Sequence, residues 1–161
     1  MDRDWMTTSI GPINFESNQY GLVRIGWGEV TRVNSDDPQL EITKKWLSDY
    51  FGGKVGERPT LDETPLTKFQ SKELGYLRDK TTTGQTITYS DLATAVGHSN
   101  ASRAVGSVMA MNPWPLLVPC HRVVCSDGEI GNYSGEGGSL TKIRLLLHEG
   151  LKFDSHGKLA H

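Results

Sequence analysis

Apolar and polar residues alternate in two segments near the start of the chain, a pattern typical of short strands. The alternation is weak over residues 10–17 and clearer over 19–28, and a third short strand is expected at 29–33. Residues 40–51 instead repeat apolar side chains at helical spacing and are followed by a glycine pair, so they predict a helix that ends there. The first part of the chain is therefore expected to hold short strands and one helix.

Beyond residue 65 the pattern becomes mainly helical. Helices are expected from Pro65 or Thr67 to just before Gly84, from Ser90 as N-cap through 92–96, over 101–111 and over 140–149. The polar, proline-bounded stretch 58–65 predicts a linker between two domains, residues 1–65 and 66–161.

The segment before Cys120 cannot continue the preceding helix. Asn112 precedes a proline, and the residue before a proline is pushed out of the helical region. The apolar residues at 116–118 predict a short buried strand that leads into Pro119 and Cys120.

Composition is that of an ordinary globular protein, with 161 residues of which 36% are hydrophobic and 22% are charged. No apolar run approaches the roughly 20 residues that cross a bilayer, and the first residues carry no secretory signal. We therefore expect an intracellular protein without membrane contact, nuclear in a eukaryote and cytoplasmic in a prokaryote. The only cysteines, Cys120 and Cys125, provide neither a disulfide framework nor a zinc spacing, so free thiols and no metal are expected.

The net charge of −2 argues against nucleic-acid binding through bulk charge. Between Asp91 and Asp127, however, no acidic residue occurs, while Arg103 and Arg122 do. Such a window suits a surface that faces phosphates. It equally suits the buried centre of a domain, and composition does not separate the two.

Two short helices joined by residues 97–100 form a helix-turn-helix pattern. The second helix is rich in small residues, which let a backbone approach a groove wall closely, and its one long cation is Arg103. A helical hairpin that packs these small residues inside the domain fits the same pattern.

Cys120 lies between Pro119 and the pair His121-Arg122. The thiolate is the nucleophilic form of cysteine, and a nearby His or Arg lowers the thiol pKa. A buried, inert cysteine at the end of a strand is the alternative. Because neighbours in a strand point to opposite faces, His121 can act on Cys120 only through a water or an irregular backbone.

Several further motifs accompany this cysteine in a fixed order. They are TITYSDLA at 86–93, RAVG at 103–106, NP at 112–113, PCHRVV at 119–124, GNYSG at 131–135 and LHEG at 147–150. Together they resemble the O6-alkylguanine-DNA alkyltransferase (methylated-DNA–protein-cysteine methyltransferase) family. The similarity is dense from Phe69 to Gly150, whereas residues 1–65 match only in general layout.

The resemblance implies an α+β fold. Residues 1–65 would form an N-terminal, ribonuclease-H-like domain with an antiparallel sheet and a helix. Residues 66–161 would form a mainly helical domain that carries the helix-turn-helix and the alkyl acceptor.

The resemblance also implies direct, irreversible DNA repair. Cys120 would accept the alkyl group of O6-alkylguanine, and of O4-alkylthymine, once per molecule and without a cofactor. His121 would take the thiol proton through a water, and Glu149 would orient His121. Arg103 would fill the space left by the flipped nucleotide, and Tyr89 would press on the adjoining phosphate.

Further roles follow from the same resemblance. Asn112 would join the recognition helix to the active-site loop. Tyr133 and Ser134 would hydrogen-bond the guanine N3 and O6, with Tyr133 donating a proton, and the carbonyls of Cys120 and Val123 would accept from the exocyclic amine. The helix would enter the minor groove of double-stranded DNA. The protein is expected to be a monomer, and whether monomers bind DNA cooperatively stays open. The remaining DNA contacts would come from Ser90, Ala101, Ala104 and Gly106.

The sequence departs from this family at a few positions. The loop 135–139 is longer than in some relatives and carries an acid near the expected pocket, which bears on the alkyl groups accepted. Trp114 stands where a smaller residue is frequent, and it is expected either at the pocket wall, as a substrate contact, or in packing. Some animal relatives hold zinc through N-terminal cysteines, and this chain has none before Cys120. Cys125 is expected to be structural, with a disulfide to Cys120 under oxidation as the alternative.

Three other functions remain open. A non-catalytic lesion sensor would lack the acceptor cysteine that is present here. A helix-turn-helix regulator would leave Cys120, His121 and Glu149 without a role. A Cys-His thiol hydrolase would not need the helix that carries Arg103.

Overall fold

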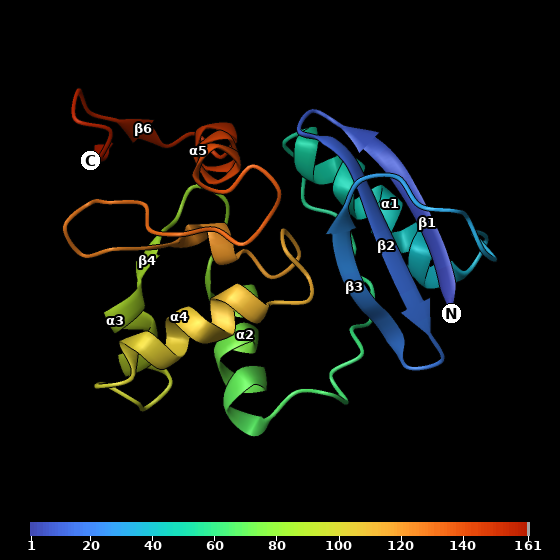
Figure 1. Ribbon diagram of the computed structural model, residues 1–161, viewed down its shortest axis with the longest axis horizontal. Helices are drawn as coiled ribbons and strands as arrows, with labels where there is room; N and C mark the ends of the chain where they lie inside the picture. The colour runs from blue at the N-terminus through green and yellow to red at the C-terminus, as the bar shows by residue number, and fades with distance from the viewer. Residues whose placement is uncertain (161) are drawn as a thin grey trace. The chain divides into compact units, whose positions relative to one another are not determined.

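The computed structural model describes residues 1–160, and the chain divides into two units, Met1–Pro65 and Leu66–His161. The first unit is an antiparallel sheet with one helix along it (Figure 1). The sheet order is β1-β2-β3. Its elements are β1 (Asp2–Thr8), β2 (Gly11–Asn18), β3 (Gly21–Trp27) and α1 (Pro38–Phe51).

Sequence chemistry accounts for the helix and the sheet core. Asp37 caps α1 by accepting a hydrogen bond from the Gln39 amide (2.9 Å), and a proline follows at the first helical position. The inward face of β2 presents Ile13 and Phe15, both fully buried, toward a helix whose Leu47 is also fully buried. Burial of these apolar faces holds the sheet and the helix together.

Two strand predictions in this unit need correction. Strand β1 was not expected, because its one buried side chain is the charged Asp4 and its sequence shows no apolar alternation. Residues 29–33 are not a strand: Gly28 turns the chain at a φ of 99°, and only Val33 pairs, through two backbone hydrogen bonds with Arg3 (2.8 and 3.0 Å). Val33 therefore forms an isolated bridge with Arg3 and not a strand.

Over its described residues, 66–160, the second unit contains four helices, a 3₁₀ turn and two small pairs of strands. Helices α2, α3 and α4 contact one another, and α5 contacts the 3₁₀ turn η1 (Figure 1). Strands β4 and β5 pair in parallel, and β6 pairs with β7 antiparallel. In chain order the elements are α2 (Lys68–Lys80), β4 (Ile87–Thr88), α3 (Tyr89–Ala95), α4 (Ser102–Met111), η1 (Cys120–Arg122), β5 (Val123–Val124), α5 (Ser139–His148), β6 (Lys152–Phe153) and β7 (Leu159–Ala160).

The N-cap of α3 differs from the prediction. Thr88, not Ser90, accepts the capping hydrogen bond, from the Asp91 amide at 3.0 Å. Ser90 lies inside the first turn and is exposed. Both hydroxyl residues suit a cap, and the pairing of Thr88 in β4 with β5 sets the helix start two residues earlier.

The expected strand at 116–118 is also wrong. These residues form tight turns in which the Val118 amide donates to the Trp114 carbonyl (2.9 Å) and Leu116 adopts a φ of 77°. Prolines at 113, 115 and 119 remove the backbone donors that a strand ladder needs. Cys120 is consequently presented on a 3₁₀ turn and not at a strand end.

No helix within residues 1–160 is both long and apolar enough to span a membrane.

Candidate active site

Cys120 is the first residue of η1, is 5% exposed, and lines a cavity of about 470 Å³. The same cavity is lined by side chains from α3, α4 and the loop that precedes α5. Among the lining residues are Tyr89, Arg103, Gly106, Met109, Cys125, Tyr133 and Ser134. Pockets of this size hold small molecules or single bases. The cavity therefore brings a thiol together with an arginine from a helix start and two phenols.

His121 is fully buried, and its Nε2 lies against the Glu149 carboxylate Oε2. A carboxylate only accepts, so Nε2 is the protonated nitrogen and Nδ1 is the basic one. Burial lowers the pKa of His121, although the Glu149 charge opposes the shift. The imidazole is thus neutral at pH 7 and able to accept a proton at Nδ1.

Glu149 is the C-cap residue of α5 and collects several donors around a fully buried side chain. Besides His121, Arg122 donates through Nε (2.8 Å) and NH2 (3.3 Å), and the Gly84 amide donates at 3.1 Å. Burial by itself would raise the pKa of Glu149, but the hydrogen bonds and charges of His121 and Arg122 outweigh it and lower the pKa to about 2. Glu149 is therefore a permanent anion beside the imidazole.

Arg122 has a different role from the one its place beside Cys120 suggested. Its guanidinium pairs with Glu149 and donates to the Thr81 carbonyl and hydroxyl, each at 3.1 Å. It is not among the groups that shift the Cys120 pKa. Arg122 therefore holds the Glu149 carboxylate in place and does not act on the Cys120 thiol.

The Cys120 thiol is neutral in this state, because burial raises its pKa. A hydrogen bond from the Asn112 side chain and the charge of Lys142 act in the opposite direction. Asn112 also donates to the Val118 carbonyl (2.8 Å) and accepts from the Trp114 amide (3.0 Å). It thereby ties the end of α4 to the turn that leads to Cys120.

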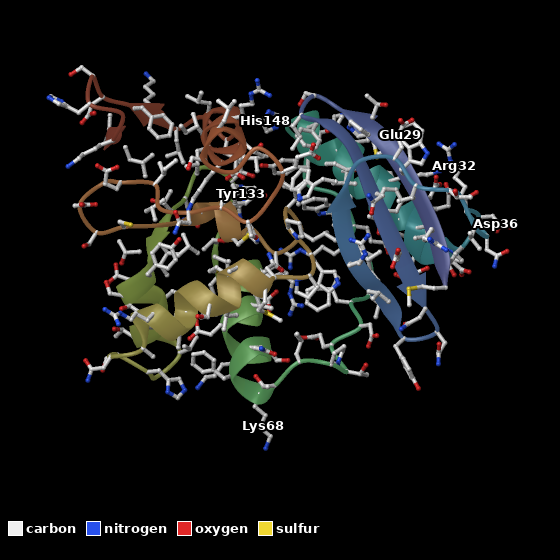
Figure 2. All side chains as sticks on the ribbon, in the orientation of Figure 1. Glu29, Arg32, Asp36, Lys68, Tyr133 and His148 are labelled. Atoms are coloured by element: carbon white, nitrogen blue, oxygen red, sulfur yellow. The ribbon has the colours of Figure 1, made fainter. Side chains whose placement is uncertain are left out.

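Two phenols in the cavity stay protonated. Burial raises the pKa of Tyr133 well above its usual value and also raises that of Tyr89, and the charge that nearby thiols carry when ionised adds to both shifts. Figure 2 labels Tyr133, which comes from the loop between β5 and α5. Both tyrosines are consequently hydrogen-bond donors at neutral pH.

The structure brings together most, but not all, of the residues that the sequence singled out. Cys120, Tyr89, Arg103, Gly106, Tyr133 and Ser134 line the cavity. His121 follows Cys120 directly in the chain and is paired with Glu149. Ser90, Ala101, Ala104 and Trp114 are not among the lining residues, and Trp114 is only 1% exposed, as a packing residue would be. Val123 is also fully buried, outside that lining, and its carbonyl accepts from Lys142.

Sequence reasoning missed Lys142. Its side chain is fully buried, and Nζ donates to the carbonyls of Val123 (2.6 Å) and Asn132 (3.2 Å). The sequence did contain a signal for its burial. Leu145, Leu146 and Glu149 follow Lys142 by three, four and seven residues, which places them on the same face of the helix, and that face is buried. Cys125, expected to be structural, also lines the cavity.

Within residues 1–160, no group of three or more His, Cys, Asp or Glu side chains could hold a metal ion.

Comparisons with known proteins point to one family. Residues 69–151 match the family described as 6-O-methylguanine DNA methyltransferase, DNA binding domain. The methylated-DNA–protein-cysteine methyltransferases of Mus musculus and Homo sapiens are similar to the chain, with 56% identity over 121 residues and 37% over 135 residues. These alignments cover 71% and 78% of this chain, but only 56% and 62% of the two relatives. The chain thus spans about three fifths of the length of these curated relatives.

Solved structures of related proteins share the fold of this chain. The Mycobacterium tuberculosis OGT crystallised in complex with DNA superposes with a TM-score of 0.77 and 28% identity, covering 93% of each chain. The mixed fold, with a small antiparallel sheet and helices, is that of the OGT structures. The chain belongs to the 6-O-methylguanine DNA methyltransferase family.

Proposed function

We propose that this protein repairs DNA by moving the alkyl group from O6 of an alkylated guanine to the Sγ of Cys120. One observation carries the proposal: the Cys120 thiol lines a cavity with Arg103, Tyr133 and Ser134, next to the buried pair His121–Glu149. A helix-turn-helix regulator needs neither the thiol nor that pair.

In the proposed reaction the S–C bond forms as the bond between O6 and the alkyl carbon breaks. The neutral imidazole of His121 takes the thiol proton, through a water because consecutive residues of a turn point apart, and Glu149 stabilises the resulting imidazolium. The protonated phenol of Tyr133 donates to the leaving guanine. The imidazolium proton then returns through solvent to the Tyr133 phenolate, so the net result is one alkyl group on Cys120 and one proton moved from the thiol to guanine.

A thioether cannot be displaced by the groups that this cavity holds, so each molecule acts once. The raised pKa of the resting thiol is consistent with this use, because the thiolate forms only when the relay through His121 is engaged. O4-alkylthymine presents the same alkyl–oxygen bond and is a second expected substrate. No bound cofactor takes part in these steps.

We further propose that α3 and α4 act as a helix-turn-helix that enters the minor groove. On α4 the side chains of Arg103, Ala104 and Ser107 are exposed, while Val105 and Val108 are buried in the unit. This leaves a surface of small side chains with one cation at the helix start, suited to close approach. Arg103 would fill the base stack and Tyr89 would press on the phosphate, offsetting a flipping cost of about a few kcal/mol.

Mass spectrometry of the intact protein tests the proposal. After incubation with a duplex that carries O6-methylguanine, we expect a gain of one methyl group per molecule, mapped to Cys120 and absent from Cys120→Ser. Cys125→Ser, which removes the other thiol, is the matched variant and should still gain the methyl group on Cys120. Repeated turnover, or binding of the lesion with no adduct, would contradict it, and the second outcome would indicate a lesion sensor.

A further inference from the structure

Lys142 is a fully buried lysine with no carboxylate partner among the described residues. Among the described residues of this unit, buried groups form ion pairs where Glu149 meets His121 and Arg122. An uncompensated buried charge destabilises a fold, and buried charges are otherwise paired or bound to metals. Its presence on α5 therefore calls for a role that an apolar side chain could not fill.

The contacts of Lys142 join the walls of the cavity. Val123, whose carbonyl accepts at 2.6 Å, directly follows the turn that carries Cys120. Asn132, whose carbonyl accepts at 3.2 Å, lines the cavity and precedes Tyr133. Nζ also lies 5.8 Å from the centre of the Tyr89 ring, within the range of a cation–π contact. One ammonium thus contacts three separate segments that line or adjoin the cavity.

The charge of Lys142 also acts on the groups that exchange protons. It lowers the pKa of Cys120 and of His121, and the thiols Cys120 and Cys125 in turn raise the pKa of Lys142. Burial is the larger influence on Lys142 and lowers its pKa to about 8, so the ammonium is still the main form at pH 7. Because Arg122 is occupied by Glu149, Lys142 is the cation that acts on the Cys120 thiol.

We propose that Lys142 is a positioning residue that fixes the turn of Cys120 against the Asn132–Tyr133 loop and stabilises the Cys120 thiolate. This inference rests on the proposed function for its biological meaning. Lys142 does not need to touch the substrate: its donors hold the backbone, and its charge favours the anionic form of the nucleophile. By lowering the basicity of His121, the same charge also keeps the imidazole neutral until the thiol proton arrives.

Three variants separate charge from hydrogen bonding. Lys142→Met keeps the length but has neither charge nor donors, Lys142→Gln keeps two donors without charge, and Lys142→Arg keeps both. Lys152→Met, at an exposed lysine of the same unit, is the control for loss of one positive charge. Melting temperatures identify the variants that remain folded.

The first readout is the rate at which iodoacetamide modifies Cys120 at pH 7, where Lys142 is still mainly an ammonium, measured by peptide mapping. The ionisable groups that face Lys142 are Cys120, Cys125, Tyr89 and His121, so mapping must report each cysteine separately. We expect the Cys120 rate to fall about tenfold in Lys142→Met and Lys142→Gln, because loss of the ammonium lowers the Cys120 thiolate fraction at pH 7 by about that factor. Lys142→Arg should recover most of the loss, and Lys152→Met should match the parent.

The second readout is methyl transfer from an O6-methylguanine duplex, which should fall at least in parallel with the thiolate fraction. An unchanged Cys120 modification rate at pH 7 in a folded Lys142→Met or Lys142→Gln overturns the proposal, and so does failure of Lys142→Arg to differ from Lys142→Gln. If neither neutral variant folds, a loss of about tenfold in that rate in a folded Lys142→Arg, which keeps the charge, overturns it as well. Absence of methyl transfer in the parent protein would refute the proposed function and leave the iodoacetamide result intact, so the two failures are distinguishable.

Discussion

The two units of this protein treat buried charge in different ways. In the N-terminal unit the buried Asp4 carboxylate meets two cations whose side chains remain in contact with water, Arg32 (53% exposed) and Lys44 (33% exposed). In the C-terminal unit His121, Arg122, Lys142 and Glu149 are all buried, and one of these charges, Lys142, has no carboxylate partner among the described residues. The first arrangement holds a strand edge to a helix, and the second keeps proton-exchanging groups out of water.

This difference indicates where chemistry is located. A charge pair that keeps one partner in solvent is screened and changes little besides stability. Charges held together away from water shift the pKa values of their neighbours, which is the condition for a reactive thiol and a proton acceptor. The largest expected effects on reactivity therefore come from changes to the buried charges of the C-terminal unit. The group formed by Asp4, Arg32 and Lys44 in the N-terminal unit supplies the control.

Removing the Glu149 charge should have the largest effect. Glu149→Gln leaves Arg122 buried without its carboxylate and frees His121 from its fixed tautomer. We expect alkyl transfer to fall about 10²–10⁴-fold and the free energy of unfolding to fall by about 3–5 kcal/mol. Single-turnover rates with an O6-methylguanine duplex and urea unfolding measure the two effects. Near-parental transfer by a folded Glu149→Gln would refute the role of the pair.

Arg103→Ala tests whether the exposed start of α4 serves DNA rather than the thiol. Loss of the side chain that offsets the energetic cost of flipping the nucleotide should slow repair of duplex DNA about 10²-fold. The reaction with free O6-benzylguanine, which needs no flipping, should change less than about threefold. Comparing the two rates in the same variant corrects for any general loss of active protein. Equal losses on both substrates would exclude a flipping role.

Glu73 provides a test in which the C-terminal unit should become more stable. Its carboxylate is fully buried in α2 with no hydrogen-bond partner among the described residues, and burial raises its pKa to about 7 from 4.5. Since the folded pKa lies above the unfolded one, this group lowers stability progressively as pH rises from about 4.5 to 7 and by a constant amount above that. Glu73→Gln should add up to about 3 kcal/mol at pH 8.

Thermal unfolding of Glu73→Gln from pH 4 to 8 checks this sign. The gain over the parent should vanish near pH 4, where Glu73 is protonated in both states. A gain that does not depend on pH would show that the amide improves packing and that the carboxyl does not titrate as expected.

Asp4→Asn should give the smallest effect and should leave the site untouched. The change removes the anion that Arg32 and Lys44 share, and because both cations reach water we expect a loss of about 1–2 kcal/mol in unfolding free energy. The rate of iodoacetamide modification at Cys120 should equal that of the parent. A slowed reaction in a fully folded variant would show that the two units share more than a covalent connection.

Much of the architecture could be predicted because it depends on local pattern. The helical spacing of residues 40–51 and the capping residues of α2 mark two helices, found at Pro38–Phe51 and Lys68–Lys80. Strand β1 escaped prediction since an edge strand with one buried, charged residue has no apolar period. The turns at 116–118 escaped because an apolar run has the same composition whether it is a strand or a turn packed in the core.

Part of the candidate site could likewise be predicted from the sequence, and part could not. The motif order around Cys120 was enough to select His121, Glu149, Arg103 and Tyr133 as residues of one family, and family membership is confirmed. Their individual roles stay predictions. The partner of Arg122 and the position of Lys142 could not be predicted, because Glu149 and Val123 lie 27 and 19 residues away from them along the chain.

The sequence by itself determined the candidate nucleophile, the family and the order of the helices, because these depend on residue type and spacing alone. Only the tertiary structure decided the electrostatics around the Cys120 thiol. It pairs Arg122 with Glu149, leaves Lys142 as the cation that acts on the thiol, and buries Cys120 so that its resting pKa is raised. Distances and burial set electrostatic energies, and both arise when segments distant in the chain pack together.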